Sequence, residues 1–218
     1  MPSILTVNLA HPRHSPDKSV LSTGIDKRPV DTAVEVRAPG PQQGGLGSGL
    51  VGDLIGNPKF HGGDDQAVYT YAREDLNAWE TELQRELSNG MFGENFTMAG
   101  IDVNEARIGE RWSIGTGGLE LEVTSPRIPC HTFADFLSLR GWTKRFTEAA
   151  KPGAYLRVIS PGTVNAGDQV VVTHRPEHDV TVRLAFRALT REPELLPDLL
   201  AAEALPERIR QQVRRRAG

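Results

Sequence analysis

Turns rich in glycine and proline divide most of this chain into short segments in which apolar and polar residues alternate. The pattern predicts β-strands at residues 4–8, 32–36, 111–114, 119–123, 154–159 and 169–173. Many short strands with few helices between them favour a closed or nearly closed β-barrel over a doubly wound parallel sheet. We therefore predict a mostly β domain over residues 1–175.

Helical spacing is confined to a few places. Residues 73–87 carry Leu76, Trp79, Leu83 and Leu87 at intervals of three and four, which predicts one amphipathic helix. A second helical stretch is expected around residues 133–146. After residue 181, prolines interrupt a run of Leu, Ala, Glu and Arg, so we predict about three short helices. Residues 176–218 are accordingly predicted to form a small C-terminal helical appendage.

The charge balance limits the classes of partner. A net charge of -3 argues against a general nucleic-acid-binding protein, which needs a basic face for phosphates. No apolar run approaches the length that spans a bilayer, and the first residues lack the pattern of a secretory signal. We expect a cytoplasmic protein that binds neither a nucleic-acid polymer nor a membrane.

The single cysteine is the most informative side chain for function. Cys130 has no second cysteine for a disulfide, and no paired Cys/His spacing indicates zinc or an iron-sulfur cluster. It follows a predicted strand end in the segment Pro126-Arg127-Ile128-Pro129-Cys130, whose prolines stiffen the backbone. Arg127 is expected to lower the pKa of the thiol by stabilising its anion. A lone cysteine also occurs as a small buried apolar residue, so its context decides.

Several other polar residues allow two interpretations each. Lys27 and Arg28 are either an exposed pair or an anion site, and His61 with the two glycines after it forms either an anion cradle or a simple turn. Asn95 either holds its own turn or reads the edge of a heterocycle. His131 would point away from Cys130 in an extended chain, although it remains a candidate proton donor.

Four motifs, taken in order, resemble the MOSC domain, the molybdenum cofactor sulfurase C-terminal family, and in particular its bacterial YiiM-like branch. They are TGIDKRPV at residues 23–30, HGGDD at 61–65, FGEN at 92–95 and PRIPC at 126–130. The resemblance covers roughly residues 1–175, and the C-terminal helices resemble the three-helix segment of that branch. It implies a MOSC-type β-barrel. The Gly-rich loop at residues 38–49, a possible lid, departs from the pattern, as does His131 after the cysteine.

The resemblance also implies a cofactor and a reaction. The cofactor is molybdenum cofactor, a pterin with a dithiolene and a phosphate, with Cys130 as the catalytic residue and metal ligand. Its pocket would be lined by Lys27, Arg28, His61, Asn95 and Arg127. The implied reaction is reduction of small N-hydroxylated compounds, such as hydroxylaminopurines or amidoximes, to amines. The chain shows no flavin or dinucleotide fingerprint, and we expect neither haem nor an iron-sulfur cluster in it. A separate electron-transfer reductase is therefore expected.

Two competing functions use the same thiol. A non-catalytic carrier of molybdenum cofactor or sulfur would hold a persulfide on Cys130 beside Arg127. A thiol hydrolase would pair Cys130 with His61, which requires the two side chains to lie within hydrogen-bond reach.

Overall fold

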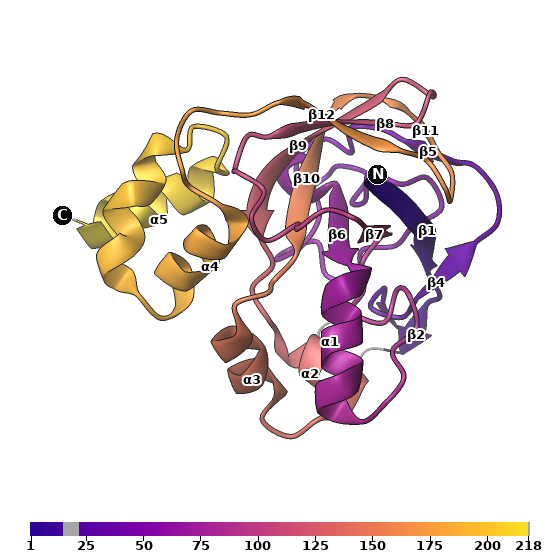
Figure 1. The fold of residues 1–218 in the computed structure, drawn as a ribbon, viewed down its shortest axis with the longest axis horizontal. Coiled ribbons are helices and arrows are strands. Elements are labelled where there is room, and N and C mark those ends of the chain that lie inside the picture. The colour runs from indigo at the N-terminus through magenta and orange to yellow at the C-terminus, as the bar shows by residue number, and fades with distance from the viewer. Residues whose placement is uncertain (15–21, 218) are drawn as a thin grey trace.

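The computed structural model describes residues 1–14 and 22–217, which form a curved sheet with helices on one side and below it (Figure 1). The strands are β1 (Ser3–Ala10), β2 (Arg13–His14), β3 (Ser22–Thr23), β4 (Lys27–Val30), β5 (Val34–Val36), β6 (Val68–Ala72), β7 (Phe96–Ala99), β8 (Arg111–Ile114), β9 (Leu119–Pro126), β10 (Ala154–Ser160), β11 (Gly162–Val164) and β12 (Val170–His174). The helices are α1 (Arg73–Leu83), α2 (His131–Leu137), α3 (Trp142–Ala149), α4 (Val182–Thr190) and α5 (Glu207–Ala217), with 3-10 turns η1 (Asp64–Gln66) and η2 (Pro193–Ala201).

Eight strands form one mixed sheet in the order β12-β8-β9-β10-β6-β7-β1-β4, and β5 with β11 and β2 with β3 form two small pairs. The sheet is not closed, so the predicted barrel is not confirmed. The second half of β1 pairs with β4, from Val7 opposite Val30 to Ala10 opposite Lys27. Only the start of β1 approaches β12, through a single bridge between Ser3 and Gln169. The observed fold is a mixed sheet with helices.

The sequence pattern missed two central strands. β6 is buried at all five positions and β7 at three of four, so neither shows the alternation that marks a half-exposed strand. The two strands run parallel, which requires a crossover, and α1 provides it. β8 has the predicted bounds, whereas β9 begins as predicted and continues to Pro126, close to Cys130.

The first helix begins at Arg73 as predicted but ends at Leu83, four residues before the predicted end. Gln84 adopts the left-handed conformation, with a φ of 52°, and this ends the helix. Leu87 nevertheless stays buried with Leu76 and Trp79 in one cluster, which is why the apolar spacing continued past the helix.

The predicted second helix is in fact two, α2 and α3, separated by left-handed residues at Ser138 and Gly141. Their aromatic side chains pack against Phe92, which lies 5.1 Å from the ring of Phe133 and 5.5 Å from that of Trp142, measured between ring centroids. This aromatic cluster fixes the segment that begins immediately after Cys130.

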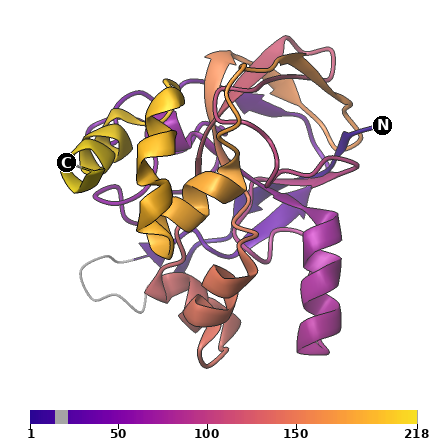
Figure 2. The ribbon, with the colours of Figure 1, turned by 60° about the vertical axis from the view of Figure 1, so that its left-hand side comes forward.

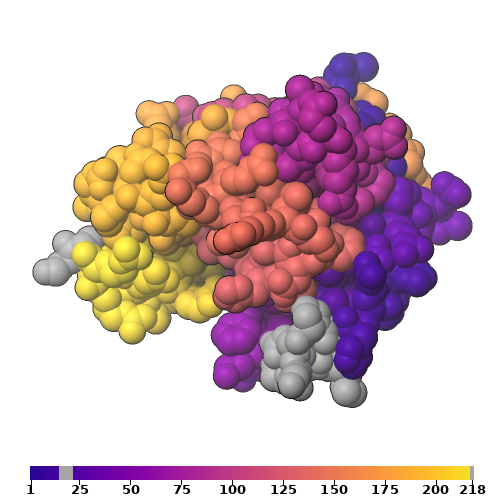
Figure 3. Space-filling model, turned by 90° about the horizontal axis from the view of Figure 1, so that it is seen from below, coloured from indigo at the N-terminus to yellow at the C-terminus, as the bar shows by residue number. Residues whose placement is uncertain are grey.

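Three helical elements follow residue 181, as predicted: α4, η2 and α5. They lie together at one side of the sheet, and Figures 2 and 3 show them next to the α2–α3 segment. Val182, Leu196 and Val213 belong to the same buried core as Leu121 of β9, so this segment packs on the sheet. Phe186 of α4 also contacts the aromatic cluster, 6.2 Å from Phe146 between centroids. The division at residue 175 remains a prediction.

No helix within the described ranges has both the length and the apolar character needed to cross a membrane.

Candidate active site

A cavity of about 670 Å³ contains the only thiol of the chain in its wall. We call it the thiol cavity and define it by six of the residues that line it: Lys27, His61, Asn95, Arg127, Cys130 and Tyr155. They come from β4, the loop before η1, the turn before β7, the segment after β9, and β10. Its volume is in the range of sites for small ligands and cofactors.

Cys130 lies four residues after the end of β9 and directly before α2, so it follows a strand end as predicted. It is partly buried. His131 also lines the thiol cavity, because the chain turns into a helix at this residue instead of remaining extended. The extended chain in which His131 would point away from Cys130 is therefore not the one observed. Its exposed imidazole is at the rim.

The thiol of Cys130 is acidified by its surroundings. Burial alone would raise its pKa, but hydrogen bonding to His61 and the positive charge of Arg127 together lower that pKa to about 6. Most of the thiol is therefore thiolate at neutral pH, which makes it a metal ligand or nucleophile. A hydrolase dyad would also need the imidazole of His61 to be oriented as a base, and no carboxylate in the described residues is paired with it.

Arg127 is a buried cation with an unusual set of neighbours. Its guanidinium lies over two rings, 4.1 Å from the centroid of Phe133 and 4.9 Å from that of Tyr69, and it donates a hydrogen bond to the carbonyl of Phe92. Only 6% of the residue is exposed, and no carboxylate of the described residues forms an ion pair with it. Its charge is balanced only by the thiolate and by whatever the cavity binds.

Lys27 also lines the cavity, but it has a partner that the sequence analysis missed. Its ammonium lies 2.5 Å from Oδ1 of Asp53, whose side chain is fully buried. Asp53 also accepts hydrogen bonds from Ser48 Oγ at 2.7 Å and from the backbone N–H of Ala10 at 2.9 Å. An isolated Asp in a loop gives no sequence signal for this role.

Asn95 is held at both ends of its amide. Its Oδ1 accepts from the backbone N–H of Tyr69 at 3.1 Å, and its Nδ2 donates to Asp53 at 2.9 Å. The amide therefore joins β6 to the Lys27–Asp53 pair, which leaves it less free to read a ligand than the sequence suggested.

Arg28 is not among the residues that line the thiol cavity. Its guanidinium pairs with Asp26 at 3.0 Å, and 60% of its side chain is exposed. Neighbouring residues of a strand point to opposite faces, so Lys27 and Arg28 of β4 cannot both face one cavity. A role for Arg28 in cofactor binding stays a prediction without support from this placement.

The two glycines after His61 are required by close packing. Gly62 and Gly63 both have positive φ, and a Cβ on Gly62 would lie 2.7 Å from the carbonyl oxygen of Gly47. The loop at residues 38–49 is hydrogen-bonded to this segment, with Gly63 N–H donating to Gly47 at 2.9 Å and Asp64 N–H donating to Gly40 at 2.9 Å. The Gly-rich loop thus positions the backbone that carries His61.

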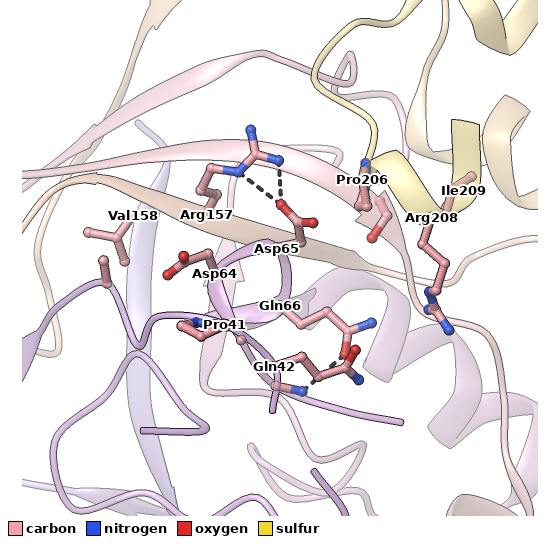
Figure 4. A pocket seen from close by; sticks show the side chains of 14 residues that line it. Pro41, Gln42, Asp64, Asp65, Gln66, Arg157, Val158, Pro206, Arg208 and Ile209 are labelled. Carbon is pink, nitrogen blue, oxygen red and sulfur yellow. Dashed lines mark hydrogen bonds and ion pairs between the residues drawn. The ribbon is translucent and has the colours of Figure 1, made fainter. Parts of the chain in front are cut away.

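A second cavity of about 510 Å³ lies behind this segment (Figure 4), and Gly62 and Gln66 line both cavities. In its wall Asp65 pairs with Arg157, which also bonds Glu122, whereas Asp64 and Arg208 form no ion pair within the described residues. Arg157 further donates to the carbonyl of Ala204 at 3.3 Å, so it ties the C-terminal segment to the sheet.

The protein provides little metal coordination of its own. The described residues contain no group of three or more His, Cys, Asp or Glu side chains that could hold a metal ion. A metal at Cys130 would therefore take its other ligands from a bound cofactor. The acidified thiol and the buried Arg127 fit such a group if it is anionic.

Comparison with known proteins agrees with the motifs. Residues 57–171 match the family model described as "MOSC domain". The chain is 32% identical over 186 residues to the uncharacterized protein YflK of Bacillus subtilis, covering 85% of this chain and 79% of that protein. It is 32% identical over 142 residues to protein YiiM of Escherichia coli, covering 63% and 61%.

A third relative, from Gibberella moniliformis, is called "Reductase" and is 28% identical over 132 residues, which are 59% of this chain and 23% of that protein. Among solved structures, YiiM from Geobacillus stearothermophilus superposes with a TM-score of 0.79 over the whole of both chains at 24% identity. YiiM from Escherichia coli gives 0.73 at 21% identity, covering 99% of this chain and 92% of the other. These two structures support the fold.

Proposed function

We propose, from the premise that the chain belongs to the MOSC domain family, that it binds molybdenum cofactor in the thiol cavity and reduces small N-hydroxylated compounds. Domains of this family are associated with binding of molybdenum cofactor. The family supplies the cofactor class, and the residues of this chain supply the reasons for its position.

One observation carries the proposal: a buried guanidinium that pairs with no carboxylate of the described residues lies beside an acidified thiol in the wall of one cavity. A cation buried in this way is stable only beside an anion. The single thiolate supplies one negative charge and leaves most of the cavity unfilled. An anionic cofactor that also needs a thiolate ligand satisfies both groups.

The residues divide the binding task. Cys130 would hold the metal, Arg127 would face anionic groups of the cofactor, and Lys27 would offer the ammonium hydrogens that Asp53 does not occupy. His61 would keep the thiol deprotonated through its hydrogen bond. When bound, the cofactor supplies a metal that exchanges two electrons with the substrate.

The reaction needs electrons from outside the described part of the chain. The relative named "Reductase" supports a reductive activity, and this chain aligns with 23% of it, so most of that protein has no counterpart here. We propose that a separate reductase protein delivers electrons to this chain, and that its substrate is a hydroxylaminopurine or an amidoxime.

The proposal is tested with protein expressed in a host that makes the cofactor and is supplied with molybdate. We expect close to one molybdenum per chain and reduction of benzamidoxime by the purified protein with reduced methyl viologen. Cys130→Ser should lose both, whereas Thr132→Ser, a change in the same cavity wall, should keep the metal. Wild-type protein that carries molybdenum but reduces no N-hydroxylated compound would overturn the proposed reductase activity.

A sulfur carrier remains the second candidate, because the thiolate of Cys130 is also what a persulfide carrier needs. Protein that is purified without molybdenum and with sulfane sulfur on Cys130 would favour the carrier. Mass spectrometry of the intact protein before and after reduction by dithiothreitol measures that sulfur.

A further inference from the structure

The chain has three tyrosines, and their hydroxyl groups differ in one respect. Tyr69 donates to the carbonyl of Pro152 at 2.8 Å, and Tyr71 donates to that of Lys151 at 2.9 Å. Tyr71 also accepts from the indole of Trp79 at 3.0 Å. The hydroxyl of Tyr155 has no hydrogen-bond partner within residues 1–14 and 22–217, and protein atoms do not enclose it completely. It therefore faces open space.

That open space is the thiol cavity, which Tyr155 lines. On β10, Tyr155 stands opposite Tyr69 of β6 and Ser125 of β9, with the two tyrosine rings 5.2 Å apart between centroids. Its neighbour Leu156 is fully buried in the core, so the alternation of the strand directs Tyr155 to the other face. The charges of Cys130 and Arg127 both act on the pKa of the Tyr155 hydroxyl.

Burial raises the pKa of Tyr155, the charge of Arg127 lowers it and the thiolate of Cys130 raises it; the result is above the ordinary value. The phenol is therefore protonated throughout the physiological range. A hydroxyl that is protonated, has no partner among the described residues and belongs to a side chain in the cavity wall has a donor available for a bound ligand.

We propose that Tyr155 is a catalytic residue that donates its proton to the departing hydroxyl oxygen of the N-hydroxylated substrate. This inference rests on the proposed function. Reduction of an N-hydroxyl group takes two electrons and two protons, breaks the N–O bond, and yields the amine and one water. The electrons come from an external reductant of the flavoprotein or viologen class. The phenol supplies one proton to the leaving oxygen and regains it from solvent, and the second proton reaches the nitrogen from solvent.

The test compares Tyr155→Phe with Tyr71→Phe, which removes the hydroxyl of a buried tyrosine that is not in the cavity wall. Each molybdenum-loaded protein is assayed with benzamidoxime and reduced methyl viologen. Metal content and the dissociation constant of benzamidoxime for the oxidised protein, from isothermal titration calorimetry, are measured alongside. General-acid groups typically contribute about 100-fold to 10,000-fold to a rate.

We expect Tyr155→Phe to lower kcat about 100-fold, with KM, metal content and the dissociation constant within about twofold of wild type. Tyr71→Phe should keep kcat and lose thermal stability. A kcat for Tyr155→Phe within threefold of wild type overturns the inference, and so does a loss of metal or of substrate affinity, because Tyr155 would then be a binding group. Loaded wild-type protein without activity overturns the proposed function and this inference with it; an active Tyr155→Phe overturns only the inference.

Discussion

The ammonium of Lys27 lies 2.5 Å from the carboxylate of Asp53 inside the protein, so two residues 26 positions apart form a buried ion pair in the wall of the candidate site. Asn95, Ser48 and the backbone N–H of Ala10 also donate hydrogen bonds to the carboxylate. The pair makes Lys27 a fixed element of the cavity wall rather than a mobile cation. Removing one partner leaves the other buried and uncompensated, which is the costly case.

Asp53→Asn should therefore lower the free energy of unfolding by about 3–5 kcal/mol at neutral pH. Burial would raise the pKa of Asp53, but the charge and hydrogen bond of Lys27 and the bonds from Ser48 and Asn95 hold it below its ordinary value. The stabilisation is thus complete above the ordinary pKa of the carboxyl and is lost as the pH falls through the lowered one. Urea unfolding from pH 7 downward measures this, and the difference from wild type should shrink in acid. Asp135→Asn, at an exposed rim position, should cost less than about 0.5 kcal/mol.

The thiol of Cys130 should react as a thiolate well below the pH expected of a free cysteine. In cofactor-free protein, the rate of alkylation by iodoacetamide should rise with an inflection near the pKa of about 6 and level off above it. The same protein in urea should show the inflection near about 8.5. His61→Ala should move the folded-state inflection upward because it removes a hydrogen bond to the thiolate. Identical inflections in folded and unfolded protein would contradict this account of the site.

Arg127 and Arg28 offer a matched pair of substitutions. Arg127→Met keeps an apolar chain between Tyr69 and Phe133 but removes the buried charge and its hydrogen bond to the carbonyl of Phe92, so the free energy of unfolding should fall by about 1–3 kcal/mol and the protein should still fold. Its molybdenum content should fall at least about tenfold, the equivalent of about 1.4 kcal/mol of binding. Arg28→Met, which changes an exposed guanidinium paired with Asp26, should keep the metal within about twofold. Equal losses from both variants would assign Arg28 to the cofactor after all.

Gly62 should tolerate no side chain. Gly62→Ala adds the cost of a left-handed backbone, about 1–2 kcal/mol, to a clash with Gly47 at 2.7 Å. Gly141→Ala has only the cost of the left-handed backbone, because a Cβ at this position would meet nothing within 4 Å. Thermal unfolding should rank Gly62→Ala as the less stable variant, and its Cys130 should lose the enhanced alkylation rate because His61 moves. An alkylation rate in Gly62→Ala equal to that of wild type would show that Gly62 does not control the position of His61.

The local pattern of the sequence was sufficient for several elements and for the placement of Cys130. Alternation gave the bounds of β8 and the start of β9, and helical spacing gave the start of α1. It failed for β6, because a strand that is buried on both faces carries no alternation. The position of Cys130 after a strand, on a stiffened segment with Arg127 before it, could be predicted because proline geometry and neighbouring charge act over a few residues.

Tertiary structure alone decided which polar groups meet in the cavity. Asp53 gave no signal in the sequence, and the choice of Lys27 over Arg28 depended on which face of β4 was turned inward. Packing likewise decided that the hydroxyls of Tyr69 and Tyr71 donate to the carbonyls of Pro152 and Lys151, whereas that of Tyr155 has no partner among the described residues. Hydrogen bonds and ion pairs act at contact distance between residues that lie far apart in the chain, so they are fixed by packing and not by the order of the amino acids.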